Sequence, residues 1–199
     1  MAKQGPIEKR DGANLPHWTS DSATYSVTFR LADSLPRAAI EELRKDIAAV
    51  ERKFAIGAEA LSLEELVRKS KAKSEAYLKL LDKGYGECLL AQDAVAEVVA
   101  GALKHFVDQR YRLYAWCVMP NHVHAVVQPL EGYNLSGVLH SWKSFTASKA
   151  NKLLGRTGSF WQRESYDHLI RDELDFRHHV AYVRENPAAA GLRNWKWVG

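Results

Sequence analysis

Two histidines that are spaced two residues apart, His122 and His124, stand in the stretch CVMPNHVHAVVQP. Apolar runs flank them on both sides, which is typical of a strand. On a strand, residues i and i+2 point to the same face, so the two imidazoles would lie side by side while Val123 points to the core. Such a pair of imidazoles is a natural chelate for a metal ion. The alternative is a pair of exposed strand histidines with no metal. Two histidines alone do not decide between these interpretations, because a metal site needs at least a third ligand.

A second group of polar residues lies near the C-terminus, in DFRHHVAYVRENP. Tyr182 and Asn186 are four residues apart and share a helix face, and His179 lies on the same stripe three residues earlier. The side-chain oxygen of Asn186 could bind a cation, and Tyr182 would then be the nucleophile beside it. In the alternative interpretation, Tyr182 packs on the core with its hydroxyl in solvent and Asn186 caps the helix before Pro187.

The surrounding pattern predicts the elements that position these residues. A strand is expected at 24–31, helices within 34–82, and a helix after Asp93. The later elements are two strands at 111–119 and 122–130, a helix at 135–154, a partly extended segment at 160–172 and a helix from 173 to about 186. This order predicts an α+β fold, a ferredoxin-like or RRM-like antiparallel sheet covered by helices, with an additional C-terminal helix that carries Tyr182.

The same pattern divides the chain into three parts. Residues 1–20 are expected to be a polar N-terminal arm, and residues 193–199 a C-terminal tail. Residues 21–192 are expected to form a single domain, in which 34–84 is a helical insertion.

Composition narrows the class of protein. The 199 residues are 46% hydrophobic and 26% charged, a balance typical of a globular protein. No apolar run has the roughly 18 residues that a membrane helix needs, and the N-terminus lacks the apolar core of a secretory signal, so a cytoplasmic location is expected. Cys88 and Cys117 form no C-x-x-C pair, so neither a disulfide framework nor a zinc knuckle is expected. The net charge of +4 permits a nucleic-acid partner.

Three separated motifs, MPNHVH, GSFWQRESYDHLIRDE and YVRENPAAAGL, together resemble the single-tyrosine HUH transposases, and more closely the REP-associated tyrosine transposases. The resemblance runs from residue 15 to about 192. It implies that His122 and His124 bind a divalent cation, and that a Tyr-x-x-x-Asn element supplies Tyr182 as nucleophile and Asn186 as third ligand. The long segment at 34–84 departs from the compact members of that family.

The resemblance also implies an activity. A protein of this kind nicks and joins single-stranded DNA through a 5′-phosphotyrosine, with Mg²⁺ or Mn²⁺ as cofactor and His179 as a possible base or accessory group. The expected substrate is a hairpin-forming repetitive element, and the expected state is a monomer or a homodimer. Tyr166 is a rival nucleophile, although no Asn follows it at the required spacing.

Several further residues are candidates for DNA contact. The helix after the hairpin carries lysines and aromatic residues, which could bind phosphates and stack on bases or, alternatively, form a solvated face above core aromatics. Trp195 and Trp197 could stack on bases or pack against the core. The candidate DNA-binding residues are Lys143, Lys149, Lys152, Arg156, Arg163 and His168.

Two other functions fit parts of the sequence. An RRM-like module would bind single-stranded nucleic acid through aromatic residues of the sheet, without cleavage. A hydrolytic metalloenzyme with an HxH pair would act on a small molecule, but it would need a third histidine or an acidic ligand, and none is obvious near the pair.

Overall fold

The computed structural model describes residues 8–11, 16–19, 23–36, 38–41, 45, 48–49, 52, 72 and 76–199. The chain divides into two compact units. One unit comprises Met1–Ala32 and Leu89–Gly199, and the other comprises Asp33–Cys88. Within the described part of the chain, no helix combines the length and the apolar character needed to cross a membrane.

The first unit is built on a four-stranded sheet whose neighbouring strands are all antiparallel, in the order β4-β5-β3-β6. Along the chain, α3 directly precedes β4, and α4 lies between β5 and β6. This βαββαβ arrangement confirms the predicted ferredoxin-like sheet. The strands are β3 (Tyr25–Arg30), β4 (Tyr111–Val118), β5 (His122–Pro129) and β6 (Tyr166–Leu169), and the helices are α3 (Asp93–His105) and α4 (Leu135–Leu153).

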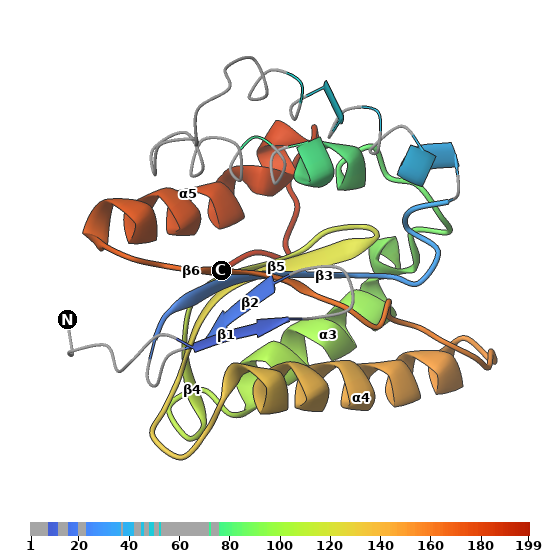
Figure 1. Ribbon diagram of the computed structural model, residues 1–199. Coiled ribbons are helices and arrows are strands. Elements are labelled where there is room, and N and C mark those ends of the chain that lie inside the picture. The colour runs from blue at the N-terminus through green and yellow to red at the C-terminus, as the bar shows by residue number, and fades with distance from the viewer. Residues whose placement is uncertain are drawn as a thin grey trace. The chain divides into compact units, whose positions relative to one another are not determined.

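Helices cover the sheet on both faces (Figure 1): α3 and α4 lie on one side, and α5 (Glu173–Ala189) lies on the other. Because side chains alternate along a strand, β5 contributes to two cores. Val123 packs in the core under α3 and α4, while Val126 packs with Val183 of α5. His122 and His124 alternate with Val123 and therefore belong to the α5 face.

The helix α5 begins at a capped turn and ends later than predicted. The side chain of Asp172 accepts a hydrogen bond from the backbone N–H of Asp175, which satisfies one donor of the first turn. The predicted end near Asn186 is wrong, because the helix continues through Pro187 to Ala189. Proline removes one helical hydrogen bond, but the backbone N–H of Ala190 still bonds to the carbonyl of Asn186 at 2.9 Å. Asn186 thus lies inside the last turn and is not an end cap.

Two segments outside the sheet were expected to be a polar N-terminal arm at 1–20 and a helical insertion at 34–84. Within the expected N-terminal arm, β1 (Glu8–Asp11) and β2 (Pro16–Thr19) pair as a small antiparallel sheet. Most of the expected insertion at 34–84 lies outside the described residues. Its described part contains a small apolar core in the second unit, formed by Leu35, Ala39, Leu80 and Leu81.

The C-terminal tail pairs with the outer edge of β4. The backbone N–H of Trp116 bonds to the carbonyl of Gly199 at 2.9 Å, and that of Val118 bonds to the carbonyl of Trp197 at 2.9 Å. The indole N–H of Trp195 donates to the Val118 carbonyl at 2.7 Å, and that of Trp197 donates to Asp93 at 3.1 Å. Both tryptophans therefore pack against the body of the first unit, and the tail covers an edge that would otherwise be open to pairing.

Candidate active site

The two histidines meet at the beginning of β5. The Nε2 atoms of His122 and His124 are 2.8 Å apart, and the side chains are 1% and 2% exposed. The prediction that the two imidazoles share one face of the sheet is confirmed. The alternative of an exposed pair is wrong, because both rings are buried.

The Nδ1 atoms of both rings have partners that fix the ring orientation. Nδ1 of His122 lies 2.7 Å from Oδ1 of Asn121, and Nδ1 of His124 lies 2.8 Å from Oγ1 of Thr28. If Nδ1–H of each ring donates to its partner oxygen, both Nε2 lone pairs converge on one point, which suits a shared cation. Neither partner was predicted from the sequence. Asn121 adjoins the pair in sequence, whereas Thr28 is its cross-strand neighbour and needs the strand register to be found.

Burial keeps these imidazoles in the form that binds metal ions. Burial lowers the pKa of His122 well below its ordinary value, and the neighbouring His124 lowers it further. Burial, with a smaller contribution from a charge on His179, lowers the pKa of His124 to about 3. Both rings are therefore neutral at pH 7, and no proton has to be removed before a cation binds.

The helix α5 brings Tyr182 and Asn186 to the histidine face. The rings of Tyr182 and His124 meet edge-on, with centroids 5.4 Å apart. One turn later, the side chain of Asn186 is 3% exposed, and its Oδ1 has no hydrogen-bond partner among the described residues. A buried amide oxygen without a partner costs about 1–3 kcal/mol. Two neutral imidazoles and an unsatisfied carboxamide oxygen are a donor set that fits a divalent cation.

A second tyrosine shares the histidine face. In the sheet register, Thr28 is opposite Tyr166 on β6 and opposite His124 on β5. Residues that are paired across antiparallel strands point to the same side of the sheet. Tyr166 therefore remains a competitor for the role of nucleophile.

The candidate DNA-binding residues of α4 lie across the sheet from the histidines (Figure 1). Lys143 is engaged within the chain: its Nζ donates to the carbonyls of Gln162 and Arg163, each at 2.8 Å, and to Oγ of Ser165 at 3.3 Å. Burial, followed by the charge of Arg30, lowers the pKa of Lys143 to about 8. This lysine anchors the loop that precedes β6, a role that the sequence did not indicate.

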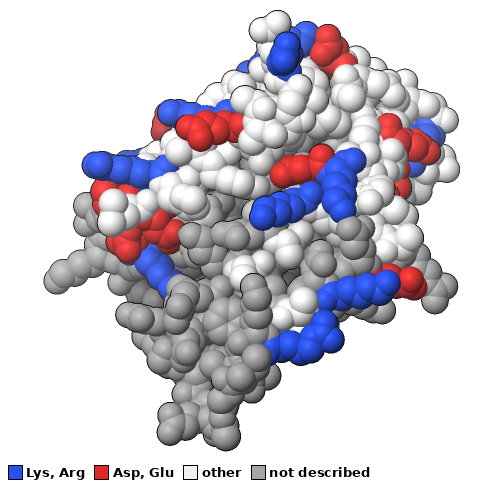
Figure 2. Space-filling view, turned by 90° about the horizontal axis from the view of Figure 1, so that it is seen from above, with Lys and Arg blue, Asp and Glu red and all other residues white. Residues whose placement is uncertain are grey.

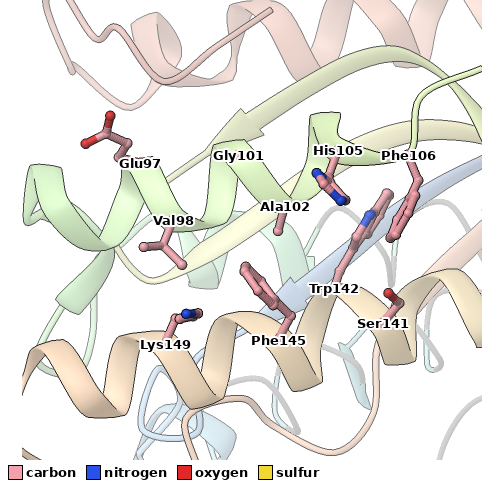
Figure 3. A pocket seen from close by; sticks show the side chains of 10 residues that line it. All are labelled: Glu97, Val98, Gly101, Ala102, His105, Phe106, Ser141, Trp142, Phe145 and Lys149. Carbon is pink, nitrogen blue, oxygen red and sulfur yellow. The ribbon is translucent and has the colours of Figure 1, made fainter.

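The aromatic residues of α4 have different environments. Trp142 is buried and donates its indole N–H to the hydroxyl of Tyr111 at 2.8 Å, so it is a core residue. Phe145 is 51% exposed, and Nζ of Lys149 lies 5.7 Å from its ring centroid. Trp142, Phe145 and Lys149 line a cavity of about 510 Å³ between α3 and α4 (Figure 3). Phe145 and Lys149 are thus available to a partner on the side of the sheet opposite the histidines.

The remaining candidates are dispersed. Lys152, in the last turn of α4, is exposed, Arg156 lies in the loop after this helix, and the side chain of Arg163 is exposed. His168 lies on β6 and is bonded to Asp175 at 2.9 Å. On the face seen from above in Figure 2, the coloured Lys and Arg side chains stand beside Asp and Glu side chains.

Comparison with known proteins identifies the region that carries the site. A family described as "Transposase IS200 like" matches residues 89–186. Residues 89–186 are thus similar to the IS200-like transposases. This region contains His122, His124, Tyr182 and Asn186, and so confirms the family resemblance of the separated motifs.

Two curated relatives are also transposases by name. A REP-associated tyrosine transposase of Escherichia coli (strain K12) is 32% identical over 88 residues, which cover 42% of this chain and 48% of the relative. A putative REP-associated tyrosine transposase of Haemophilus influenzae is 25% identical over 101 residues, which cover 44% of this chain and 57% of the relative. The chain thus spans about half the length of these relatives.

A solved structure of a REP-associated tyrosine transposase bound to a REP hairpin is similar over 94% of this chain and 82% of the other. Its sequence identity is 18% and its TM-score is 0.48. At this level of similarity, neither the fold nor the ligand is carried over from that protein to this chain.

Proposed function

We propose that this protein is a metal-dependent enzyme that nicks and joins single-stranded DNA, with Tyr182 as the nucleophile. The observation that carries the proposal is the buried pair of His122 and His124, whose Nε2 atoms are 2.8 Å apart and against which the Tyr182 ring packs. The IS200-like family of this region supports the same reaction class.

The cation would be held by His122, His124 and Asn186. A bound Mg²⁺ or Mn²⁺ supplies a positive charge that neutralises and orients a phosphodiester. Oxygen donors favour these ions, while the two imidazoles also suit softer metals. Oδ1 of Asn121 and Oγ1 of Thr28 would keep the imidazole rings in place by accepting hydrogen bonds from Nδ1–H, so that both Nε2 atoms face the cation.

The chemical step is a transesterification in which Oη of Tyr182 attacks the scissile phosphorus. The Oη–P bond forms as the tyrosine hydroxyl loses its proton to solvent, the bond from phosphorus to the 3′ oxygen breaks, and the leaving 3′ oxygen takes a proton from solvent. The product is a 5′-phosphotyrosine and a free 3′-hydroxyl. Because the phosphodiester count is unchanged, another 3′-hydroxyl can reverse the step without an energy source. His179 precedes Tyr182 by one turn, but its Nε2 faces Asp175 at 3.4 Å, so the proposal assigns it no part in proton transfer.

The proposed substrate is single-stranded DNA near a hairpin of a repetitive element. The names of both curated relatives support a REP-type element. The structure supports two separate DNA contacts: the scissile strand at the histidine face and the flanking DNA at Phe145 and Lys149. A single strand also bends more easily than a duplex to align one phosphate with Tyr182.

A non-catalytic RRM-like module is less favoured. Such a module stacks bases on aromatic residues of an open sheet. Here α5 covers the corresponding face, where Tyr114 of β4 packs edge-on against Phe176 of α5 with centroids 5.0 Å apart.

The test is a denaturing gel with labelled single-stranded hairpin DNA, with and without Mn²⁺. The proposal predicts a metal-dependent covalent protein–DNA adduct together with a shortened strand. Retarded but intact DNA would support the binding module and contradict the enzyme.

A further inference from the structure

We propose that His168, Asp175 and His179 form a second metal site, which binds a transition metal ion of the Zn²⁺ type and ties β6 to the first turns of α5. These three residues are separate from the predicted ligands His122, His124 and Asn186. The proposal depends on metal binding alone and is independent of the nicking activity.

The three side chains converge on one point. Nε2 of His168 lies 2.9 Å from Oδ2 of Asp175, and Nε2 of His179 lies 3.4 Å from Oδ1 of the same carboxylate. The two imidazole rings stack at a centroid distance of 4.6 Å, and one ligand atom from each residue lies within 4.8 Å of the other two. Ligands of one metal ion at about 2.0–2.2 Å are themselves roughly 3 Å apart, so small shifts suffice to enclose an ion.

The backbone holds the carboxylate in position. Oδ2 of Asp175 accepts a hydrogen bond from the backbone N–H of Arg171 at 3.1 Å, and the Asp172 cap fixes the backbone of Asp175 at the start of α5. His179 follows Asp175 by one helical turn, which places both on one face of α5. His168 comes from β6, so the site joins two elements that the chain connects only by a short loop.

The donor set selects a class of ion. Two imidazoles and one carboxylate are typical of Zn²⁺ and related first-row ions and are a poor match for Ca²⁺ or Mg²⁺, which prefer oxygen. The side chains of His168, Asp175 and His179 are 28%, 23% and 20% exposed, so an ion can enter from solvent and keep water as a further ligand.

The position of the site suggests what a bound ion would do. His179 precedes Tyr182 by three residues on α5, and a metal bridge to His168 would fix this part of the helix against the sheet. Occupancy of the second site would therefore restrict the orientation of the Tyr182 side chain over the histidine pair. Without the ion, His168 is hydrogen-bonded to Asp175, and His179 lies 3.4 Å from the same carboxylate.

Equilibrium dialysis of the full chain against Zn²⁺, with the bound metal measured by mass spectrometry, tests the proposal. We expect the double variant His168→Gln, His179→Gln to bind one equivalent of Zn²⁺ less than the wild type. The variant His178→Gln, at an exposed histidine next to His179, is the matched control and should lose none. The double variant His122→Ala, His124→Ala should retain the second-site equivalent.

The outcomes separate this proposal from the proposed function. If the His168, His179 variant binds one equivalent of Zn²⁺ less than the wild type, the second site is supported. If the His122, His124 variant binds as much Zn²⁺ as the wild type, that result counts against the first site and leaves the second site unaffected. Should the double variant fail to fold, Asp175→Asn is expected to weaken Zn²⁺ binding by at least about tenfold in a folded protein. Unchanged stoichiometry in the folded double variant, or unchanged affinity in Asp175→Asn, overturns the proposal.

Discussion

The ring of Tyr182 on α5 lies edge-on to the ring of His124 on β5, with centroids 5.4 Å apart and planes at 77°. The proposed nucleophile and a proposed metal ligand thus touch, although they belong to different elements. Any change that moves α5 relative to the sheet is expected to alter the reaction, even when all of the proposed active-site residues are intact.

Replacing His124 by alanine is expected to abolish metal-dependent cleavage, with a loss of at least about 100-fold. The change also leaves the hydroxyl of Thr28 without its imidazole partner at 2.8 Å, so we expect it to cost about 1–3 kcal/mol of the free energy of unfolding. Cleavage rates and urea unfolding measure the two effects separately. Full metal-dependent cleavage by the folded variant would remove His124 from the mechanism.

Asn186→Ala is expected to weaken the metal site without removing the nucleophile. Cleavage should fall at low metal concentration and recover in part at high Mn²⁺, since only one of three protein ligands is lost. The stabilisation of the fold by Mn²⁺, measured as the shift in melting temperature, should also decrease. An equal Mn²⁺ requirement in the wild type and the variant would show that Asn186 is not a ligand.

The metal-free protein is expected to lose stability as the pH falls below about 6.5. In the unfolded chain His122 and His124 take up protons near that pH, whereas burial keeps the folded pKa lower, to about 3 for His124. The unfolded state then binds more protons, and the free energy of unfolding decreases by up to about 1.4 kcal/mol per pH unit for each imidazole.

Urea unfolding in the presence of EDTA, between about pH 7.5 and pH 5, measures this dependence. His124→Gln removes one of the two titrating rings and should have a shallower slope. The same slope in both proteins would show that His124 does not titrate as its burial implies.

Sequence patterns predicted the sheet, the helix layers and the shared face of His122 and His124 because these depend on local periodicity. They did not predict the role of Thr28, since that depends on strand register, or the cluster of His168 with Asp175, since that depends on how α5 returns to β6. The predicted end of α5 near Asn186 was wrong because it rested on the local effect of Pro187 on the backbone. The sequence does not show that Val183 and Pro187 are both buried, and their packing favours continuation of the helix.

Two lysines of α4 are expected to behave differently. Lys143→Met removes three internal hydrogen bonds and should destabilise the fold by about 1–3 kcal/mol.

Lys149→Ala, at an exposed position, should change stability by less than about 0.5 kcal/mol but weaken binding of hairpin DNA. If Lys149 contacts a phosphate, the slope of log affinity against log salt should decrease by about one. An unchanged salt slope would exclude that contact.

The most direct measurement is mass spectrometry of the peptide that carries the trapped nucleotide after cleavage of single-stranded hairpin DNA. We predict that the adduct maps to Tyr182 and disappears in Tyr182→Phe, at every metal concentration, because this change removes one oxygen and little volume. Tyr166→Phe is the matched control, since Tyr166 also faces the histidine side of the sheet, and it should form the adduct normally. An adduct on Tyr166, or on any residue outside α5, would contradict the assignment of Tyr182 as the nucleophile.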